Sequence, residues 1–414
     1  MAAMIEIIPE RPFDEGVEQG RQLDKPAMLA RIEELLASPY RRDTLGAMAR
    51  DELVEMTCRR LHTPPDYRQY PELEDLYPER LEFIRGLAQG AECLLDDAAL
   101  YSYLTYRDEI DTWYHLFQTQ PGPSHCSGIF LKGPDGMLGG HSMESAPPPR
   151  PAEYRHRKPA RHEGTRVLRP VRARLTLKKP RTGYIEQWGV SNEKGVGCFA
   201  EAACGVLLDE PIEDTWPIGR VPLLRFARNV DHLAELYTRY HLFNWGRASL
   251  LFADIHGNAM VVEKSFRRIG IRMLGNEDVL WCTEGYFESP EMNAYLRAKR
   301  REFLEKTGRH LGCEDMQYAN DCGVRFTHLG ELCYQPWGRG YDHMRRILAD
   351  HSPFPRAICR HAGPDTAAYD RTVTQRSIFR DLTHNRSFER TWIPWTKFCC
   401  EVPEEVVQYP HIPA

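Results

Sequence analysis

Cys126 is the residue of this sequence whose type and position point most directly to chemistry. It follows the proline-containing approach PGPSH and opens a run from Gly128 to Lys132 whose composition predicts a β-strand. A cut between His125 and Cys126 would make the cysteine a new N-terminus. Its thiol would then be the nucleophile, and its α-amino group, with an ordinary pKa of about 7.7–8.0, would be the base. An ordinary buried cysteine at a strand start is the alternative.

A second predicted strand returns beside the cysteine and carries a carboxylate. The segment Pro134-Asp135-Gly136 predicts a tight turn, after which an extended, small-residue segment runs to Glu144. A carboxylate on the neighbouring strand can hold the freed ammonium or orient the thiol, although an exposed strand glutamate would fit the same pattern. His141 and Ser142 precede it and are candidates for lining the substrate site.

Several ordered motifs resemble the start of the mature catalytic subunit in the penicillin acyltransferase family of N-terminal nucleophile (Ntn) hydrolases: Cys126-Ser127-Gly128, Asp135-Gly136 and Gly139-Gly140-His141-Ser142-Met143-Glu144. Others follow in the family's order: residues 189–196, Ala253-Asp254 with Gly257 and Glu263, and residues 358–361 ahead of Arg371-Thr372-Val373. The resemblance implies a self-cleaving cysteine enzyme that acts on a small amide or acyl donor and needs no cofactor, with acyl-coenzyme A as a further candidate donor.

The resemblance also implies hydrogen-bond donors for the acyl oxygen. Asn192, in the segment SNEKG, corresponds to a family asparagine that faces the site, although an asparagine before a tight turn also suits left-handed backbone geometry. The family's oxyanion-hole asparagine corresponds here to Ser249, with Asn244 as the alternative donor. Loss of such a donor typically costs about 2.7–4 kcal/mol in rate. Asp254, Gly257 and Glu263 are interpreted as structural.

The segment from Ala146 to Gly164 is proline-rich and basic. It is either a solvated loop or a lid in which Arg150, Arg155 and Arg157 bind an anionic substrate, such as a carboxylate or a coenzyme phosphate. The residue before the nucleophile is commonly small in Ntn enzymes, whereas here it is His125.

The sequence therefore favours an Ntn amidohydrolase or acyltransferase that forms an acyl-enzyme on Cys126. The alternatives are an amide-forming acyltransferase in a biosynthetic pathway, an unprocessed, non-catalytic ligand-binding relative, and a cysteine–histidine protease, for which no local signature accompanies any of the 16 histidines. The resemblance divides the chain into residues 1–125, a mostly helical small subunit, and residues 126–414, the catalytic core, and the two fragments are expected to stay associated.

Composition restricts the partners. A formal net charge of −5 and a pI near 6.4 over 414 residues give no reason to expect a nucleic-acid partner. Neither a targeting pattern nor an apolar stretch long enough for a membrane span is visible, so a cytoplasmic protein is expected. The 12 cysteines lack paired C-x-x-C spacing, which predicts free thiols and no metal site. The adjacent Cys399 and Cys400 leave a metal or redox site as the alternative.

Helical periodicity predominates in the first 115 residues. It predicts helices over 14–36 with a break at Pro26, over 43–60, after Pro78, and over 96–110. Gly86 and Gly90 would allow another element to approach the third helix closely.

Later segments alternate between strand and helix signals. Strands are predicted over 172–177, 184–190, 197–203, 249–255, 259–264, 267–274, 357–360 and 372–382, and helices over 221–228, 231–242, 290–307 and 339–349. Hairpins with separate helices predict an α+β protein of antiparallel sheets covered by helices. The resemblance implies the four-layer αββα sandwich of the Ntn hydrolases, with an N-terminal helical segment.

Overall fold

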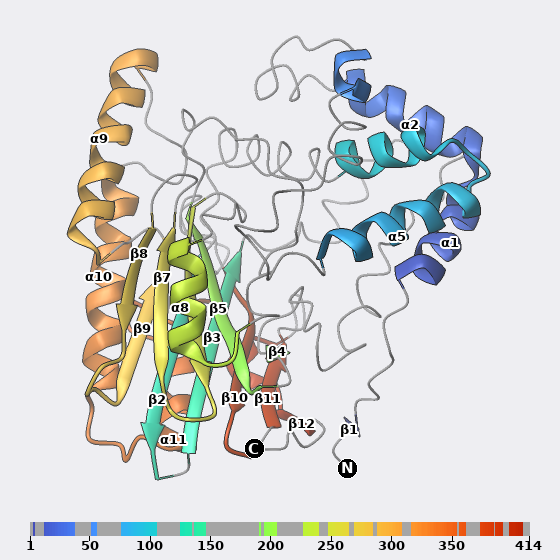
Figure 1. The fold of residues 1–414 in the computed structure, drawn as a ribbon. Helices are drawn as coiled ribbons and strands as arrows, with labels where there is room; N and C mark the ends of the chain where they lie inside the picture. The colour runs from blue at the N-terminus through green and yellow to red at the C-terminus, as the bar shows by residue number, and fades with distance from the viewer. Residues whose placement is uncertain are drawn as a thin grey trace. The chain divides into compact units, whose positions relative to one another are not determined.

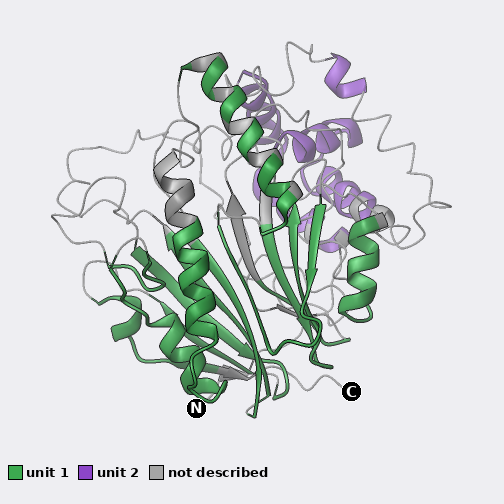
Figure 2. Cartoon of the chain, turned by 90° about the vertical axis from the view of Figure 1, so that its left-hand side faces the viewer, with its two compact units in different colours: residues 1–8, 117–207, 220–414 green, residues 9–116, 208–219 purple. Residues whose placement is uncertain are grey.

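The computed structural model describes residues 3–4, 12–37, 51–55, 76–105, 125–134, 136–145, 190–191, 194–204, 227–239, 247–264, 269–284, 288–308, 316–353, 356–361, 373–384, 386–391 and 397–408. The chain forms two compact units (Figure 2). One comprises residues 1–8, 117–207 and 220–414, and the other residues 9–116 and 208–219. The expected division of the chain at the cleavage site, between residues 125 and 126, stays a prediction.

A seven-stranded sheet carries the candidate nucleophile. Its order is β1 (Ala3–Met4), β12 (Glu405–Gln408), β11 (Arg386–Thr391), β10 (Val373–Asp381), β3 (Gly136–Ser145), β2 (His125–Gly133) and β9 (Val279–Thr283). Neighbouring strands are antiparallel except β1 and β12, which are parallel. The predicted hairpin after Cys126 is confirmed as β2 and β3, which lie side by side near the centre of Figure 1.

A five-stranded antiparallel sheet forms the second layer. Its order is β4 (Val190–Ser191), β5 (Val196–Cys204), β6 (Arg247–Asp254), β7 (Ala259–Lys264) and β8 (Ile269–Met273). The predicted tight turn between β6 and β7 contains Gly257, whose φ of 85° suits glycine because it has no Cβ.

The two sheets pack face to face through an apolar layer. Phe130 of β2, Phe199 of β5 and Leu251 of β6 belong to one buried cluster. The approach is close at Gly139, where an added Cβ would lie 2.2 Å from the Phe199 ring. Only glycine fits between these two sheets at that position.

Helices cover the outer faces of both sheets. On the seven-stranded sheet, Ile129 packs in one cluster with Leu329 of α10 (Met316–Cys333) and Met344 of α11 (Tyr341–Leu348). On the five-stranded sheet lies α8 (Val230–Arg239), whose Tyr237 ring lies 5.6 Å from that of Phe252, while α9 (Pro290–Thr307) contacts β8. The described elements thus form helix, sheet, sheet and helix layers (Figure 1), which confirms the α+β class and is consistent with the expected αββα order.

One strand prediction was wrong, and some elements were missed. Residues 357–360 are not a strand, because the Ile358 carbonyl accepts side-chain hydrogen bonds instead of joining a ladder. The helix α10 and the strands β1, β9, β11 and β12 were not predicted. The strand expected over 172–177, most of that over 184–190 and most of the helix expected over 221–228 lie outside the described residues. Of the remainder, Val190 begins β4, whereas Ala227 and Arg228 are not helical.

The helical unit contains α1 (Pro12–Leu23), α2 (Lys25–Ala37), α5 (Leu76–Gly90) and a further helix over 95–105. The chain breaks between α1 and α2 at Asp24, which has a φ of 50° and whose carboxylate accepts from the Ala27 N–H at 2.8 Å. The predicted close approach at α5 is confirmed. A Cβ added to Gly86 would lie 2.0 Å from the Phe13 carbonyl oxygen of α1, so the backbones of α1 and α5 touch.

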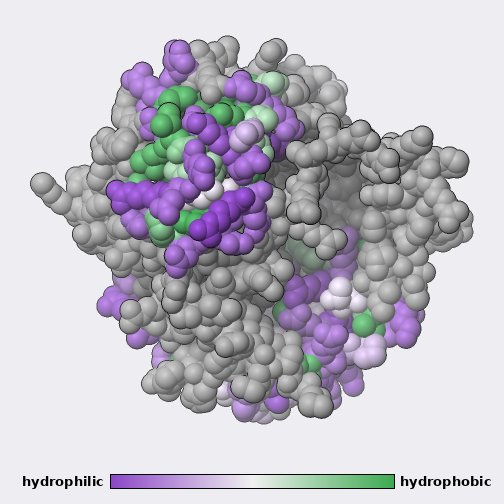
Figure 3. All heavy atoms as spheres, turned by 90° about the vertical axis from the view of Figure 1, so that its right-hand side faces the viewer, coloured by the Kyte–Doolittle hydropathy of each residue, from purple (hydrophilic) through white to green (hydrophobic). Residues whose placement is uncertain are grey.

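Figure 3 shows one face of the molecule, coloured by the hydropathy of each residue. Hydrophobic and hydrophilic atoms of described residues are mixed on this face. None of the described helices combines the length and the apolar composition needed to cross a membrane.

Candidate functional site

Cys126 lies near the start of β2 and faces the space between the two sheets. Phe130 on the same strand packs between the sheets, whereas Ile129 and Leu131 pack against the helices. Because side chains alternate along a strand, Cys126 points to the same side as Phe130. Its side chain is 8% exposed, and its carbonyl oxygen accepts from the Glu284 N–H at 3.0 Å.

The surroundings of Cys126 keep its thiol protonated. Burial raises its pKa well above the ordinary value of a thiol, and the carboxylates of Glu284 and Glu144 raise it further. The guanidinium of Arg325 and a hydrogen bond from the Glu144 backbone act in the opposite direction and are weaker. In the continuous chain, Cys126 is therefore a neutral thiol at neutral pH.

Glu144 lies on β3 directly opposite His125, so it is level with the bond that precedes Cys126. Its side chain, however, points away from the thiol. Gly140 faces α11, because an added Cβ there would lie 2.6 Å from the Met344 sulfur, and Glu144 shares that face of the strand. The thiol and the carboxylate thus belong to opposite faces of the same sheet.

The Glu144 carboxylate is held by three side chains. Arg325 of α10 donates through Nη2 at 2.8 Å, Thr374 of β10 donates through Oγ1 at 3.2 Å, and Ser142 donates through Oγ. Glu144 and Arg325 are 0% and 1% exposed. The pair is therefore a buried ion pair, for which such additional hydrogen bonds are needed to offset desolvation.

The carbonyl oxygen of Ile358 ties this network to a neighbouring loop. It accepts from Ser142 Oγ at 3.1 Å, from Arg325 Nη2 at 3.3 Å and from Thr374 Oγ1 at 3.4 Å. Ser142, expected to line the substrate site, therefore lies on the helix-covered face within the Glu144 network. Its predicted role in substrate binding stays a prediction.

His141 lies on the same face as Cys126, opposite Gly128 of β2. Its side chain is 1% exposed. Burial lowers its pKa to about 3, and the nearby guanidinium groups of Arg376 and Arg325 contribute. His141 is therefore uncharged at neutral pH. Its side chain faces the layer between the two sheets.

Ser249 lies on β6 and faces the same inter-sheet layer. Its neighbour two residues on, Leu251, packs in that layer, and Ser249 pairs with Glu263 on β7. Its buried Oγ has no hydrogen-bond partner within the described part of the chain. Asn192, Asn244, Arg150, Arg155 and Arg157 lie outside the described residues, as does the side chain of His125.

The residues interpreted as structural are confirmed in that role. Asp254 accepts from the backbone N–H groups of His256 at 2.9 Å and Asn258 at 3.1 Å, which fixes the turn, and from that of Val230 at 2.9 Å, which attaches α8. Glu263 accepts from the backbone N–H groups of Glu288 at 2.8 Å and Ser289 at 2.9 Å.

Sequence reasoning missed Arg325, because an arginine on an unpredicted helix gives no sign of its partner. The available signal was the apolar stripe of Phe326, Leu329 and Cys333 at helical spacing, which predicts a buried helix face beside it. A charged residue adjacent to such a stripe is almost never fully buried unless it is paired.

A hollow of about 520 Å³ lies at the other end of β2. Its walls are formed by the hairpin and the chain after α10, namely Lys132, Gly133, Pro134, Asp278, Tyr334, Gln335, Pro336, Gly338 and Arg339. None of the predicted site residues that the structure describes is among these.

No protein-family model and no curated protein sequence matches this chain. Solved structures give faint likenesses. A mutant of the conjugated bile acid hydrolase from Clostridium perfringens is 14% identical, with a TM-score of 0.36 over 69% of this chain and 97% of that chain. The penicillin V acylase from Agrobacterium tumefaciens is 11% identical, with a TM-score of 0.28 over 69% of this chain and 82% of that chain. At these values neither structure establishes a fold family or an activity for this chain.

Proposed function

We propose that this protein is a self-processing cysteine amidase of the Ntn type, cut between His125 and Cys126. One observation carries the proposal: Cys126 stands near the start of β2 and faces the inter-sheet space, while a buried carboxylate, Glu144, lies level with the preceding peptide bond. An N-terminal nucleophile needs its thiol directed to a substrate site and its new α-ammonium held by an acid.

The charges around Cys126 suit a new ammonium group. Two carboxylates, Glu284 and Glu144, and one guanidinium, Arg325, act on it electrostatically. The two carboxylates would stabilise the α-ammonium freed by cleavage, while the guanidinium opposes it.

Self-processing begins when the Cys126 thiol attacks the carbonyl carbon of His125 and gives its proton to the departing amide nitrogen. The carbon–nitrogen bond breaks, and His125 is then held as a thioester. Water hydrolyses this thioester, which leaves a carboxylate on His125 and a free thiol and amine on Cys126.

Substrate turnover repeats the same chemistry with the α-amine of Cys126 as base. The α-amine takes the thiol proton as the sulfur attacks the amide carbonyl, and passes this proton to the departing nitrogen of the substrate. Water then hydrolyses the thioester, which releases the acid and restores the thiol. His141 and Ser249 face the same inter-sheet space, and Ser249 is the described side chain proposed to donate to the acyl oxygen, with Asn244 as the alternative. The substrate class is a small N-acyl amide or acyl donor.

The test is the denatured intact mass of freshly purified protein. The wild type should give fragments of 125 and 289 residues (414 minus 125), whereas Cys126→Ala should give one intact chain. Cys282→Ala is the matched control, because Cys282 is buried on the adjacent strand β9 and packs in the same inter-sheet cluster. It should be processed like the wild type.

An intact wild type would overturn the proposal and favour the ligand-binding alternative, which the buried, protonated thiol of Cys126 would fit. An acyl-coenzyme A donor distinguishes transfer to an amine from hydrolysis. Only in transfer does the release of coenzyme A increase with the amount of added amine.

A further inference from the structure

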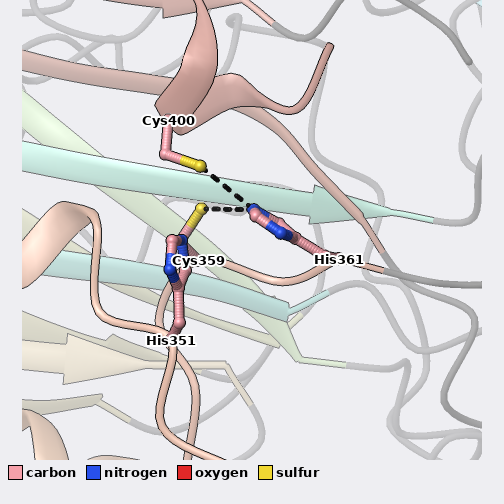
Figure 4. Close-up of side chains that lie close together, drawn as sticks. All are labelled: His351, Cys359, His361 and Cys400. Carbon is pink, nitrogen blue, oxygen red and sulfur yellow. Dashed lines mark hydrogen bonds between the residues drawn. The ribbon is translucent and has the colours of Figure 1, made fainter. Parts of the chain in front are cut away.

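Four side chains that could bind a metal converge outside the Cys126 site. They are His351, Cys359, His361 and Cys400, and Figure 4 shows them directed toward a common point. Their ligand atoms all lie within 4.8 Å of one another. Cys400 comes from the 3-10 helix Cys399–Glu401, and the others come from the loop after α11, so the group joins two segments distant in sequence.

The spacing of the donor atoms is close to that of a tetrahedral site. His361 Nε2 lies 3.5 Å from Cys359 Sγ and 3.1 Å from Cys400 Sγ. A zinc ion with Zn–S bonds of about 2.3 Å and Zn–N bonds of about 2.05 Å has ligand–ligand edges of about 3.3–3.8 Å. With all donor atoms within 4.8 Å of one another, any pair would need to close by at most about 1.5 Å to reach these edges.

The surrounding residues orient these donors. The His361 ring stacks on Phe398, with ring centroids 3.8 Å apart and an interplanar angle of 6°. The neighbouring cysteine, Cys399, is turned away, because its thiol donates to the Arg390 carbonyl at 3.3 Å. Only Cys400 of the adjacent pair thus points into the group. His351 and His361 are exposed, so an ion can reach the site from solvent.

We propose that His351, Cys359, His361 and Cys400 bind one zinc ion. Two thiolates and two imidazoles are the ligand set of closed, structural zinc sites, in which no position is left for substrate. Binding deprotonates both thiols and releases the two protons to solvent. From the sequence, no metal site is expected because the cysteines lack C-x-x-C pairs. Such spacing does not reveal ligands that are distant in the sequence and brought together by folding.

The zinc ion would stabilise the loop beside the Glu144 network. Ile358, whose carbonyl accepts from Arg325 at 3.3 Å, immediately precedes the ligand Cys359. The Arg360 N–H, between two ligands, donates to Thr374 Oγ1 at 2.8 Å. Zinc binding would therefore hold the groups that contact Glu144 and join the C-terminal segment to the sheet.

The experiment measures metal content and cobalt spectra of the full-length protein, independently of activity. Wild-type protein dialysed against zinc and then metal-free buffer should retain about one equivalent of zinc. Cobalt(II) should give thiolate-to-cobalt charge-transfer bands and intense visible bands of a tetrahedral site. When zinc is limiting, the Cys400→Ser and Cys359→Ser proteins should each bind at least about tenfold less zinc than the wild type.

Cys399→Ala and Cys93→Ala are the matched controls, because Cys399 points away from the group and Cys93 lies in the helical unit. Both should keep the zinc and the cobalt spectrum. The proposal is overturned if the wild type retains no zinc and gives no tetrahedral cobalt spectrum, if Cys400→Ser binds as much as Cys399→Ala, or if Cys359 and Cys400 form a disulfide in anaerobically purified protein. The cobalt spectrum of the wild type decides the case even where a variant fails to fold.

Discussion

Arg325 donates to the Glu144 carboxylate at 2.8 Å, and both side chains are fully buried between the seven-stranded sheet and α10. The pair is placed level with the bond before Cys126, although its atoms lie on the face of the sheet opposite the thiol. It thus connects the candidate cleavage site with the helix layer.

The Glu144–Arg325 pair should show strong coupling in a double-mutant cycle. Glu144→Gln or Arg325→Gln alone leaves one buried charge uncompensated, which typically costs about 3–5 kcal/mol. The double variant should lose clearly less than the sum, because two neutral amides can hydrogen-bond to each other. Urea denaturation measures this in a Cys126→Ala background, which keeps the chain intact. Additive losses would contradict the assignment of a coupled pair.

His141 should make the stability depend on pH. Burial lowers its pKa to about 3, whereas an unfolded histidine titrates near 6.5. Between these values the unfolded state binds more protons, so the free energy of unfolding should fall as pH drops from 6.5 toward 3, by up to about 1.4 kcal/mol per pH unit. Above 6.5 the histidine contributes no slope. His141→Gln should flatten this part of the profile in denaturation experiments at several pH values, and an unchanged profile would contradict the buried, neutral state.

The thiol of Cys126 should be unreactive in uncut chains. Its side chain is buried and burial raises its pKa, whereas Cys93 is half-buried in the helical unit. Burial also raises the pKa of Cys93, but less than that of Cys126, so iodoacetamide should alkylate the more accessible Cys93 faster because the thiolate is the reactive form. Peptide mapping resolves the sites, and the peptide that contains both His125 and Cys126 reports the uncut chain. In urea the two rates should converge; equal rates in the folded protein would show that Cys126 is accessible.

Gly86→Ala should destabilise the helical unit. A Cβ there would lie 2.0 Å from the Phe13 carbonyl oxygen, so α1 and α5 must separate, and overpacking of this kind typically costs about 1–3 kcal/mol. Gln89→Ala, an exposed substitution on the same helix, is the control and should be nearly neutral. Thermal unfolding compares the two, and a Gly86→Ala protein as stable as the control would contradict the close helix contact.

Local sequence signals predicted the elements whose periodicity is strong. The strand β7 and the helix α9 coincide with the predicted ranges 259–264 and 290–307, since an apolar run beside a turn and a long helical pattern are both local features. The helix α10 was not predicted, although it covers the seven-stranded sheet. Residues 357–360 were predicted as a strand because of their apolar composition, which does not reveal that the Ile358 carbonyl accepts hydrogen bonds from side chains.

The sequence by itself determined the hairpin that carries Cys126, the structural turn at Asp254, and the close-packing glycines of α5, because each depends on neighbours a few residues apart. Only the tertiary structure decided that Glu144 pairs with Arg325 on the face opposite Cys126, and that Cys400 meets His361. Those contacts join residues 181 and 39 positions apart. Separations of that size leave no periodic pattern, since it is the stacking of layers and the alternation of strand faces that bring such side chains together.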